Sequence, residues 1–186
     1  MPTDVYSVTI KKPIEMVFDY VTTPAWWPIY HPTSKKVEPF AKHSLKVGEH
    51  STETCVLDPA GIVKFVIDWT GTENDGRTLF RMEGNSDSFT GADGTITYEL
   101  SETPEGTLFK RTFEYELGGI FGKLFEAQAR ILGEGTRTVH PDEDDIIGEL
   151  QSHSTAPSSS IIGKLIEKDG TDALDNVKAI LESMPC

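Results

Sequence analysis

Hydrophobic and polar residues alternate along the stretch from Gly94 to Leu117, as is typical of two paired antiparallel strands. The residues that share one face are Ile96, Tyr98 and Leu100 in the first half, and Phe109, Arg111, Phe113, Tyr115 and Leu117 in the second. The residues between the two halves, Thr103 to Gly106, have the composition of a turn. The pattern therefore predicts a half-buried hairpin with one face turned to the interior.

Arg111 interrupts this pattern, because it places a cation on the apolar face of the hairpin. Burying a guanidinium without a partner costs several kcal/mol, so some partner is expected. One interpretation is that Arg111 lines a cavity and orients a carboxylate or carbonyl group of a ligand. The alternatives are a structural ion pair with a carboxylate, or a side chain that reaches solvent at the sheet edge.

Further segments have the composition of strands, which gives a sheet of about six to seven strands. They are Val5–Ile10, Lys36–Phe40, Ser51–Leu57, Ile62–Thr70 and Thr78–Glu83. The last is preceded by a hairpin turn at residues 74–76 and followed by a polar loop at Gly84–Asp93. The faces of residues 51–57 and 78–83 stay open, because their alternation is poor.

Two short helices are predicted after the first strand. Lys12-Pro13 opens the first, with proline at its first helical position, and the capping signal Thr23-Pro24 precedes the second at Ala25–Tyr30. Apolar spacings of three and four predict another helix at Phe121–Leu132 and a long last helix at Ile161–Met184. The apolar stripe of the last helix is Leu174, Val177, Leu181 and Met184.

This order of elements predicts a single α+β domain over residues 1–186. A strongly curved antiparallel sheet has to cover its apolar concave face, and only the last helix is long enough to do so. A sheet wrapped around one helix often encloses a cavity for a small molecule. Residues from about 134 to 160 differ from the rest: an acidic run is followed by a Ser/Thr/Pro-rich stretch. We expect a flexible insertion there.

The composition of the chain excludes several classes of binding partner. The net charge of −13 argues against nucleic acid or an anionic membrane, since both need a cationic face. No signal peptide and no stretch of about 20 apolar residues is visible, so we expect a cytoplasmic protein without a membrane span. Motifs for zinc, phosphate loops or a nucleophile elbow are missing, and His140 beside the acidic run fits a solvated loop better than a metal site. We expect no metal and no cofactor.

Four segments in this order resemble the helix-grip superfamily of START-like proteins, and within it the polyketide cyclase/dehydrase and lipid-transport family. The residues that carry the resemblance are Lys12–Phe18, Trp27 with Pro32, the hairpin match of Gly94–Leu100 with Gly106–Tyr115, and Ala173–Glu182. The resemblance implies a helix-grip fold, in which a curved antiparallel sheet wraps around a long C-terminal helix. It implies no fixed catalytic motif, so the catalytic residues stay unknown.

The candidate ligand-binding residues are aromatic or polar and lie on the expected inner surface. They are Arg111, Tyr98, Tyr115, Trp69, Trp27, Tyr30, His31 and Phe113. Trp27, Tyr30 and His31, with Trp26, form an aromatic cluster that either borders a cavity, with His31 as an acid or base, or packs the short helix onto the sheet. The tyrosines either bind a ligand hydroxyl or bond to each other and to Arg111. Glu53 and Glu83 are weaker candidates for an acid, a base or a partner of Arg111.

The expected function is the binding of a small hydrophobic or aromatic molecule, with polyketide cyclase or dehydratase chemistry, free of any cofactor, as one option. The first alternative is a non-catalytic carrier or sensor of a lipid, quinone or hormone-like ligand. The second is a protein-interaction module with a vestigial cavity. Whether the protein is an enzyme, and its oligomeric state, are not fixed by the sequence, because one fold hosts many functions.

Overall fold

The computed structural model describes residues 3–56, 64–86, 92–118, 123 and 161–185. Apart from residue 123, the helix expected at 121–132 lies outside the described residues, as do His140 and the insertion expected at about 134–160. Those three expectations stay predictions.

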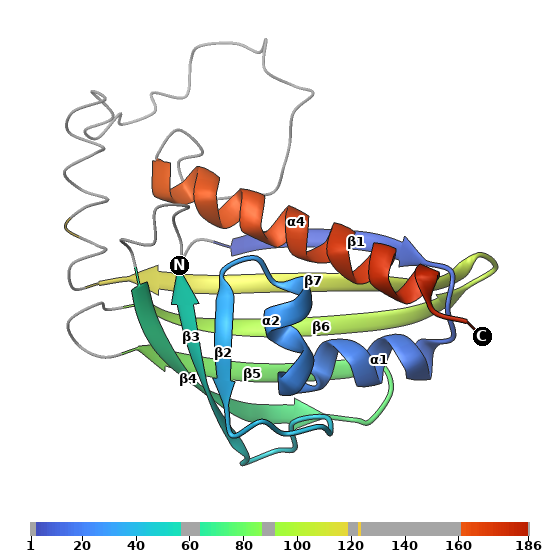
Figure 1. Ribbon diagram of the computed structural model, residues 1–186, viewed down its shortest axis with the longest axis horizontal. Coiled ribbons are helices and arrows are strands. Elements are labelled where there is room, and N and C mark those ends of the chain that lie inside the picture. The colour runs from blue at the N-terminus through green and yellow to red at the C-terminus, as the bar shows by residue number, and fades with distance from the viewer. Residues whose placement is uncertain (1–2, 57–63, 87–91, 119–122, 124–160, 186) are drawn as a thin grey trace, which may run out of the picture.

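Seven strands form one antiparallel sheet that curls around a layer of helices (Figure 1). Their order across the sheet is β1-β7-β6-β5-β4-β3-β2, so the first strand pairs with the last. The strands are β1 (Thr3–Ile10), β2 (Ser34–Glu38), β3 (His50–Val56), β4 (Lys64–Asn74), β5 (Leu79–Ser86), β6 (Ala92–Thr103) and β7 (Gly106–Leu117). The predicted α+β class and the number of strands are confirmed.

Strands β6 and β7 form the predicted hairpin. Tyr98 lies opposite Arg111, and Leu100 lies opposite Phe109. The turn ends at Gly106, which has a positive φ of 135°, and a side chain there would place its Cβ 2.2 Å from the carbonyl oxygen of Ile10. Glycine is therefore required at the point where the hairpin passes the end of β1.

Two strands extend beyond their predicted ends. β4 continues through a bulge near Gly71, and β5 continues to Ser86. A bulge shifts the following side chains to the other face, so the alternation that marks a strand is lost there. The loop predicted at Gly84–Asp93 was too long, because Gly84 still pairs with Gly94 of β6.

Three short helical segments follow β1, as expected in position but with small corrections. They are α1 (Ile14–Thr22), η1 (Pro24–Trp26) and α2 (Trp27–Tyr30). Pro13 stands just before α1 rather than at its first position. Thr23 does not cap the next helix with its side chain; its hydroxyl donates instead to the carbonyl of Asp19 at 2.6 Å. This bond satisfies one carbonyl at the end of α1, where the last carbonyls have no partner within the helix.

The long helix α4 (Ile161–Ser183) runs along β1 and contacts α2 (Figure 1). Leu174, Val177 and Leu181 are buried in the common core, as their spacing predicts. The side-chain amide of Asn176 donates to the carbonyl of Tyr30 at 2.9 Å. This bond fixes α4 to α2 beside the aromatic cluster.

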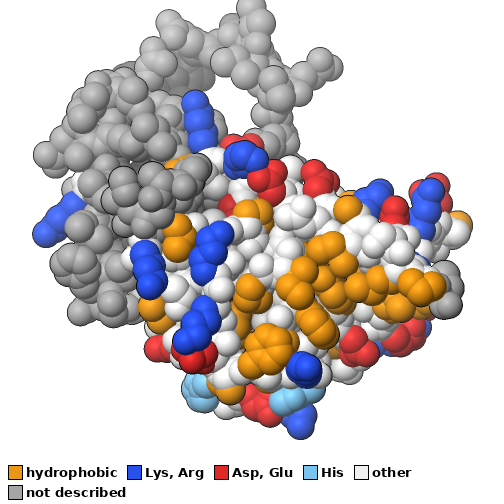
Figure 2. Space-filling model, viewed as in Figure 1, with side chains coloured by type: hydrophobic (Ala, Val, Ile, Leu, Met, Phe, Trp, Pro, Cys, Tyr) orange, Lys and Arg blue, Asp and Glu red, His pale blue; other side chains and the backbone are white. Residues whose placement is uncertain are grey.

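Hydrophobic side chains gather over the helices on the face shown in Figure 2, with charged side chains around them. Among the described residues, Ile29 of α2 and Phe40 after β2 are large apolar side chains that stay exposed. None of the described helices is long and apolar enough to cross a membrane.

Candidate ligand-binding site

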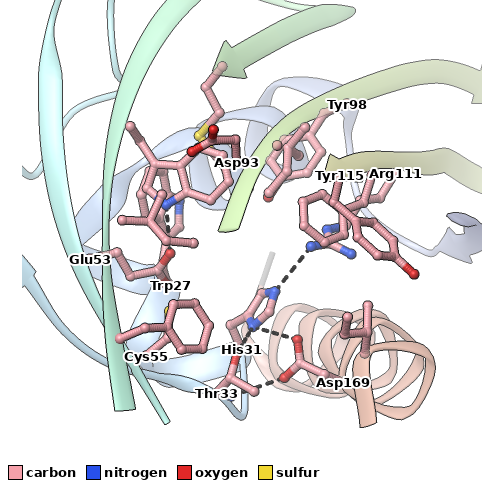
Figure 3. A pocket seen from close by; sticks show the side chains of 18 of the residues that line it. Trp27, His31, Thr33, Glu53, Cys55, Asp93, Tyr98, Arg111, Tyr115 and Asp169 are labelled. Carbon is pink, nitrogen blue, oxygen red and sulfur yellow. Dashed lines mark hydrogen bonds and ion pairs between the residues drawn. The ribbon is translucent and has the colours of Figure 1, made fainter. Parts of the chain in front are cut away.

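A cavity lies between the sheet, the α2 region and the first half of α4 (Figure 3). The space open to the centre of a water-sized sphere is about 90 Å³. Since one water needs roughly 10–15 Å³ by this measure, there is room for several waters or for a small organic group. Every ligand-binding residue predicted from the sequence lines this cavity, namely Arg111, Tyr98, Tyr115, Trp69, Trp27, Tyr30, His31 and Phe113.

Arg111 is the most unusual group of the cavity wall. The residue is only 5% exposed, and its guanidinium lies over the rings of Phe113 and Tyr6 at 5.2 and 5.9 Å from their centroids. Its Nε has no hydrogen-bond partner among the residues that the structure describes. Within the described part of the chain no carboxylate forms an ion pair with it.

The two carboxylates that the sequence suggested as partners of Arg111 do not form an ion pair with it. Glu53 is buried on the inner face and accepts a hydrogen bond from Nε1 of Trp69 at 2.8 Å. Glu83 is on the outer, exposed face. The structure thus decides the facing of both strands that the sequence left open, and neither carboxylate neutralises the guanidinium directly.

His31 joins Arg111 to helix α4. Its Nε2 lies 3.4 Å from a terminal nitrogen of Arg111, and its Nδ1 lies 3.1 Å from Oδ2 of Asp169. The other oxygen of Asp169 accepts the backbone N–H of Thr33 at 3.0 Å, and the Thr33 hydroxyl is 3.1 Å from Nδ1. Figure 3 shows this chain of contacts at the edge of the cavity.

The contacts assign the proton of the His31 ring. Arg111 can only donate, so Nε2 has to accept and carries no proton; the carboxylate of Asp169 can only accept, so Nδ1 donates. Burial alone would raise the pKa of the Asp169 carboxyl, but the electrostatic interaction and hydrogen bond with His31, the Arg111 charge and the hydrogen bond from Thr33 outweigh burial and lower that pKa. Asp169 is therefore ionised at neutral pH and holds the ring in one tautomer.

Three tyrosines border the cavity in neutral form. Burial is the largest cause that raises the pKa of Tyr30, Tyr98 and Tyr115, and for Tyr115 the carboxylate of Asp4 adds to it. The Tyr98 hydroxyl interacts with both the Tyr30 hydroxyl and the Arg111 guanidinium. Tyr98 and Arg111 therefore form one polar group, whereas Tyr115 directs its hydroxyl to Asp4 of β1.

The aromatic cluster of α2 is held by a single carbonyl. Nε1 of Trp27 and the hydroxyl of Tyr30 donate to the carbonyl oxygen of Val21 at 3.1 and 3.0 Å. Trp26 instead stacks on Tyr20, with ring centroids 6.0 Å apart. Trp27 thus borders the cavity, as one alternative drawn from the sequence predicts, whereas Trp26 packs on Tyr20 of α1.

The aromatic rings of the cavity wall are closely fitted against glycines of the sheet. An added Cβ at Gly84 would lie 2.4 Å from the Trp69 ring, and one at Gly94 would lie 2.7 Å from the Phe113 ring. These glycines leave the room that the rings occupy. Cys55 also lines this wall, but burial and then the nearby Glu53 raise the pKa of its thiol well above the ordinary value, so it stays protonated and weakly nucleophilic.

A family model described as polyketide cyclase / dehydrase and lipid transport matches residues 1–139. The chain belongs to this family. The resemblance seen in the sequence is therefore confirmed. Among curated proteins, no match was found.

Solved structures from several sources share the fold of this chain. A protein from Chromobacterium violaceum has a TM-score of 0.61 and 13% identity, covering 99% of this chain and 100% of its own. A conserved protein from Geobacillus kaustophilus has a TM-score of 0.63 and 12% identity, covering 97% and 95%. Ara h 8.0201 has a TM-score of 0.57 and 10% identity, covering 98% of each chain. At such identities the likeness is one of fold alone.

Asp169 is the site residue that sequence reasoning missed. It is buried three positions after Ile166 and four before Ala173, so it lies on the apolar stripe of α4. A charged residue on an apolar stripe is the same signal that singled out Arg111. Here it was hidden, because Asp169 stands between Lys168 and Gly170 in a stretch that looks polar and solvated.

Metal ligands are not grouped in this site. The described residues contain no set of three or more His, Cys, Asp or Glu side chains that could hold a metal ion. The polar groups that the site presents to a ligand are a guanidinium, a tyrosine hydroxyl and a carboxylate-bound imidazole, which lie around an apolar space.

Proposed function

We propose that this protein binds a small, largely apolar or aromatic molecule whose anionic or carbonyl oxygen lies against Arg111 and Tyr98. The observation that carries the proposal is Arg111, a residue that is 5% exposed, lies in the cavity wall and has no ion-pair partner among the described carboxylates. Membership in a family described by polyketide cyclase / dehydrase and lipid transport supports a ligand of this kind.

The energetics of burial favour a ligand oxygen at Arg111. A guanidinium kept out of water without an anion costs several kcal/mol, and the ring contacts with Phe113 and Tyr6 offset only part of this. The contact with His31 is at the long end of the hydrogen-bond range, at 3.4 Å. A carboxylate, enolate or carbonyl oxygen would supply a short, charge-assisted acceptor instead.

The other residues of the cavity wall determine which chemical character the rest of the ligand should have. Trp69, Ile67, Met82 and Ile96 present apolar surface, and the polar ends of Trp69 and Trp27 are already bonded inside the protein. Apart from Glu53, which accepts the hydrogen bond from Trp69, a ligand thus meets polar groups on one side and hydrophobic groups on the other, which is the usual composition of small-molecule sites. An open cavity of this kind favours binding over a vestigial cavity in an interaction module.

Two matched probes test the proposal: 2-naphthoate, which is anionic, and 2-naphthamide, which is uncharged and of nearly the same shape. Isothermal titration calorimetry should give a wild-type dissociation constant for each. Arg111→Met should weaken 2-naphthoate about tenfold or more, since a charge-assisted hydrogen bond is lost, and change 2-naphthamide about threefold or less. Arg77→Met is the control, because Arg77 is exposed and pairs with Glu15 and Glu102.

Equal weakening of both probes by Arg111→Met would show that the residue shapes the cavity instead of binding an oxygen. Failure of the wild type to bind either probe would contradict the proposal for aromatic ligands of this size. Native mass spectrometry of the protein from its own host is the independent measurement, and a co-purified acidic or carbonyl-bearing molecule is the expected result.

A further inference from the structure

The pair of His31 and Asp169 has a geometry that ligand binding alone does not need. Asp169 holds Nδ1 of the ring at 3.1 Å and is itself fixed by the backbone N–H of Thr33 at 3.0 Å. The side chains of His31 and Asp169 are only 14% and 11% exposed. They come from the segment after α2 and from α4, so two separate elements meet to orient one imidazole (Figure 3).

The free nitrogen of the ring faces the cavity and the oxygen-binding group. With its proton on Nδ1, His31 presents an unprotonated Nε2, and Arg111 lies 3.4 Å from that nitrogen. A ligand oxygen bound by Arg111 would replace this weak contact and release the Nε2 lone pair. The step then requires the C–H carbon adjacent to the carbonyl group to lie on the side of His31.

We propose that His31, oriented by Asp169, is a general base that removes an acidic C–H proton from a small cyclic or aromatic carbonyl compound bound at Arg111 and Tyr98. This inference rests on the proposed binding function and adds a reaction to it.

The step balances without an oxidant, reductant or metal. The C–H bond next to the carbonyl breaks, and its proton passes to Nε2 of His31. The electron pair forms the C=C bond of an enolate, whose negative oxygen is held by Arg111 and Tyr98. Asp169 stabilises the imidazolium that forms. Return of the proton to the same carbon gives exchange, and its return to a different carbon of a conjugated ligand gives an isomer.

Three residues of the proposed step were already predicted from the sequence to line a cavity. The alternation of the hairpin predicts this for Tyr98 and Arg111, and the aromatic cluster predicts it for His31. Here the carboxylate satisfies Nδ1, while Nε2 meets a donor that a ligand can displace. Such a combination is the arrangement by which a carboxylate prepares an imidazole as a base.

The probe for the test is 5-nitrobenzisoxazole, a small aromatic compound. A base removes its ring C–H proton, the electron pair forms a nitrile, and the N–O bond breaks to give a coloured phenolate. The reaction needs only a base and a group that holds the new oxygen anion. Wild-type protein should accelerate phenolate formation above the rate in buffer, and in D₂O it should also exchange the acidic C–H protons of 2-tetralone, measured by NMR.

His31→Gln should lower the protein-dependent rate about 100-fold or more, which is the ordinary contribution of a general base. Imidazole added to His31→Ala should restore part of the rate. The matched control is His43→Gln, because His43 makes the same kind of contact with Glu49, at 3.1 Å, on the exposed surface. That control should keep the wild-type rate.

Asp169 is a positioning residue, so its variant needs a readout beyond rate. In Asp169→Asn the new amide can still accept from Thr33 through its oxygen, but its nitrogen would then face Nδ1 of His31 as a donor. The proton of the ring would have to move from Nδ1 to Nε2. Nε2 would then have no free lone pair and could not act as a base. Nitrogen-15 NMR of the imidazole should show this change of tautomer, together with a fall in rate of about tenfold or more.

The binding of 2-naphthoate, measured in each variant, separates the two proposals. Binding with loss of rate in His31→Gln supports both. Binding with an unchanged rate in His31→Gln, or with no acceleration in the wild type, overturns the base and leaves ligand binding intact. No binding to the wild type overturns both.

Discussion

The hairpin of β6 and β7 has one inner face, but its two halves serve different purposes. Near the turn, Leu100 and Phe109 face each other and are packed under α1 together with Phe80 and Phe18. Toward the other end, Ile96 and Phe113 face each other across the same two strands, yet they line the cavity. The pair of Tyr98 and Arg111 stands between the halves.

The difference comes from what covers the sheet. Helix α1 contacts β6 and β7 and fills the half near the turn with large side chains. Past Tyr98 the paired glycines at 84 and 94 carry no side chains, and α4 covers β1 instead of the hairpin. The same alternation thus produces core where a helix presses on it and a cavity wall where none does.

The largest effect on stability is expected when two phenylalanines of the same strand, one from each half, are compared. Phe109→Ala should lower the free energy of unfolding by about 3–5 kcal/mol, because the 1% exposed ring packs against Tyr98 and leaves a hole. Phe113→Ala should lower it by less than about 2 kcal/mol, because the ring is only partly buried and already borders empty space. Chemical denaturation measures both, and equal losses would contradict the division into two halves.

The sequence predicts the half near the turn better than the cavity half. Alternation with period two is a local property, so the hairpin, its turn and the inward placement of Tyr98 and Arg111 follow from it directly. Likewise, the spacing of Leu174, Val177 and Leu181 is enough to place one face of α4 in the core. These features depend on a residue and its near neighbours alone.

The site depends on segments far apart in the chain, and there the prediction is incomplete. Thr33 and Asp169 are joined by a hydrogen bond across 136 positions, and no local pattern announces it. That Arg111 lacks an ion-pair partner among the described residues likewise follows from where Glu53 and Glu83 point. Eight cavity residues could be named from sequence, but Asp169 and the contacts between the site residues could not, and the role of each in binding stays a prediction.

A smaller effect is expected at the edge of the cavity half, in Asp169→Asn. The change should lower the free energy of unfolding at pH 7 by about 1–3 kcal/mol, because charge-assisted hydrogen bonds from His31 and Thr33 are weakened. The folded-state pKa of Asp169 is lowered below its ordinary value of 3.8. Its contribution is therefore present above pH 3.8 and is lost as the pH falls through the folded-state value.

Denaturation of both proteins at a series of pH values measures this dependence. The difference between wild type and Asp169→Asn should shrink as the pH is lowered below 3.8. A difference that stays constant down to the most acidic stable pH would mean that Asp169 contributes through packing and not through its charge.

The smallest effect on stability is expected where the two halves meet, in Arg111→Met. Removing a buried cation that has no carboxylate partner among the described residues should change the free energy of unfolding by less than about 1 kcal/mol, or raise it. The methionine keeps much of the apolar stem that packs on Phe113 and Tyr6. The exposed Arg77→Met is again the control, since a surface ion pair contributes about 0–1 kcal/mol.

This last variant has two readouts that move in different directions under the two interpretations of Arg111. If the guanidinium serves a ligand, stability in the absence of ligand is kept and the affinity for 2-naphthoate falls. If it is a structural ion-pair partner, the loss is about 3–5 kcal/mol, because a carboxylate is left buried without its cation. The second outcome would make the cavity half a core held by charge, and the contrast between the two halves of the hairpin would then be one of packing density alone.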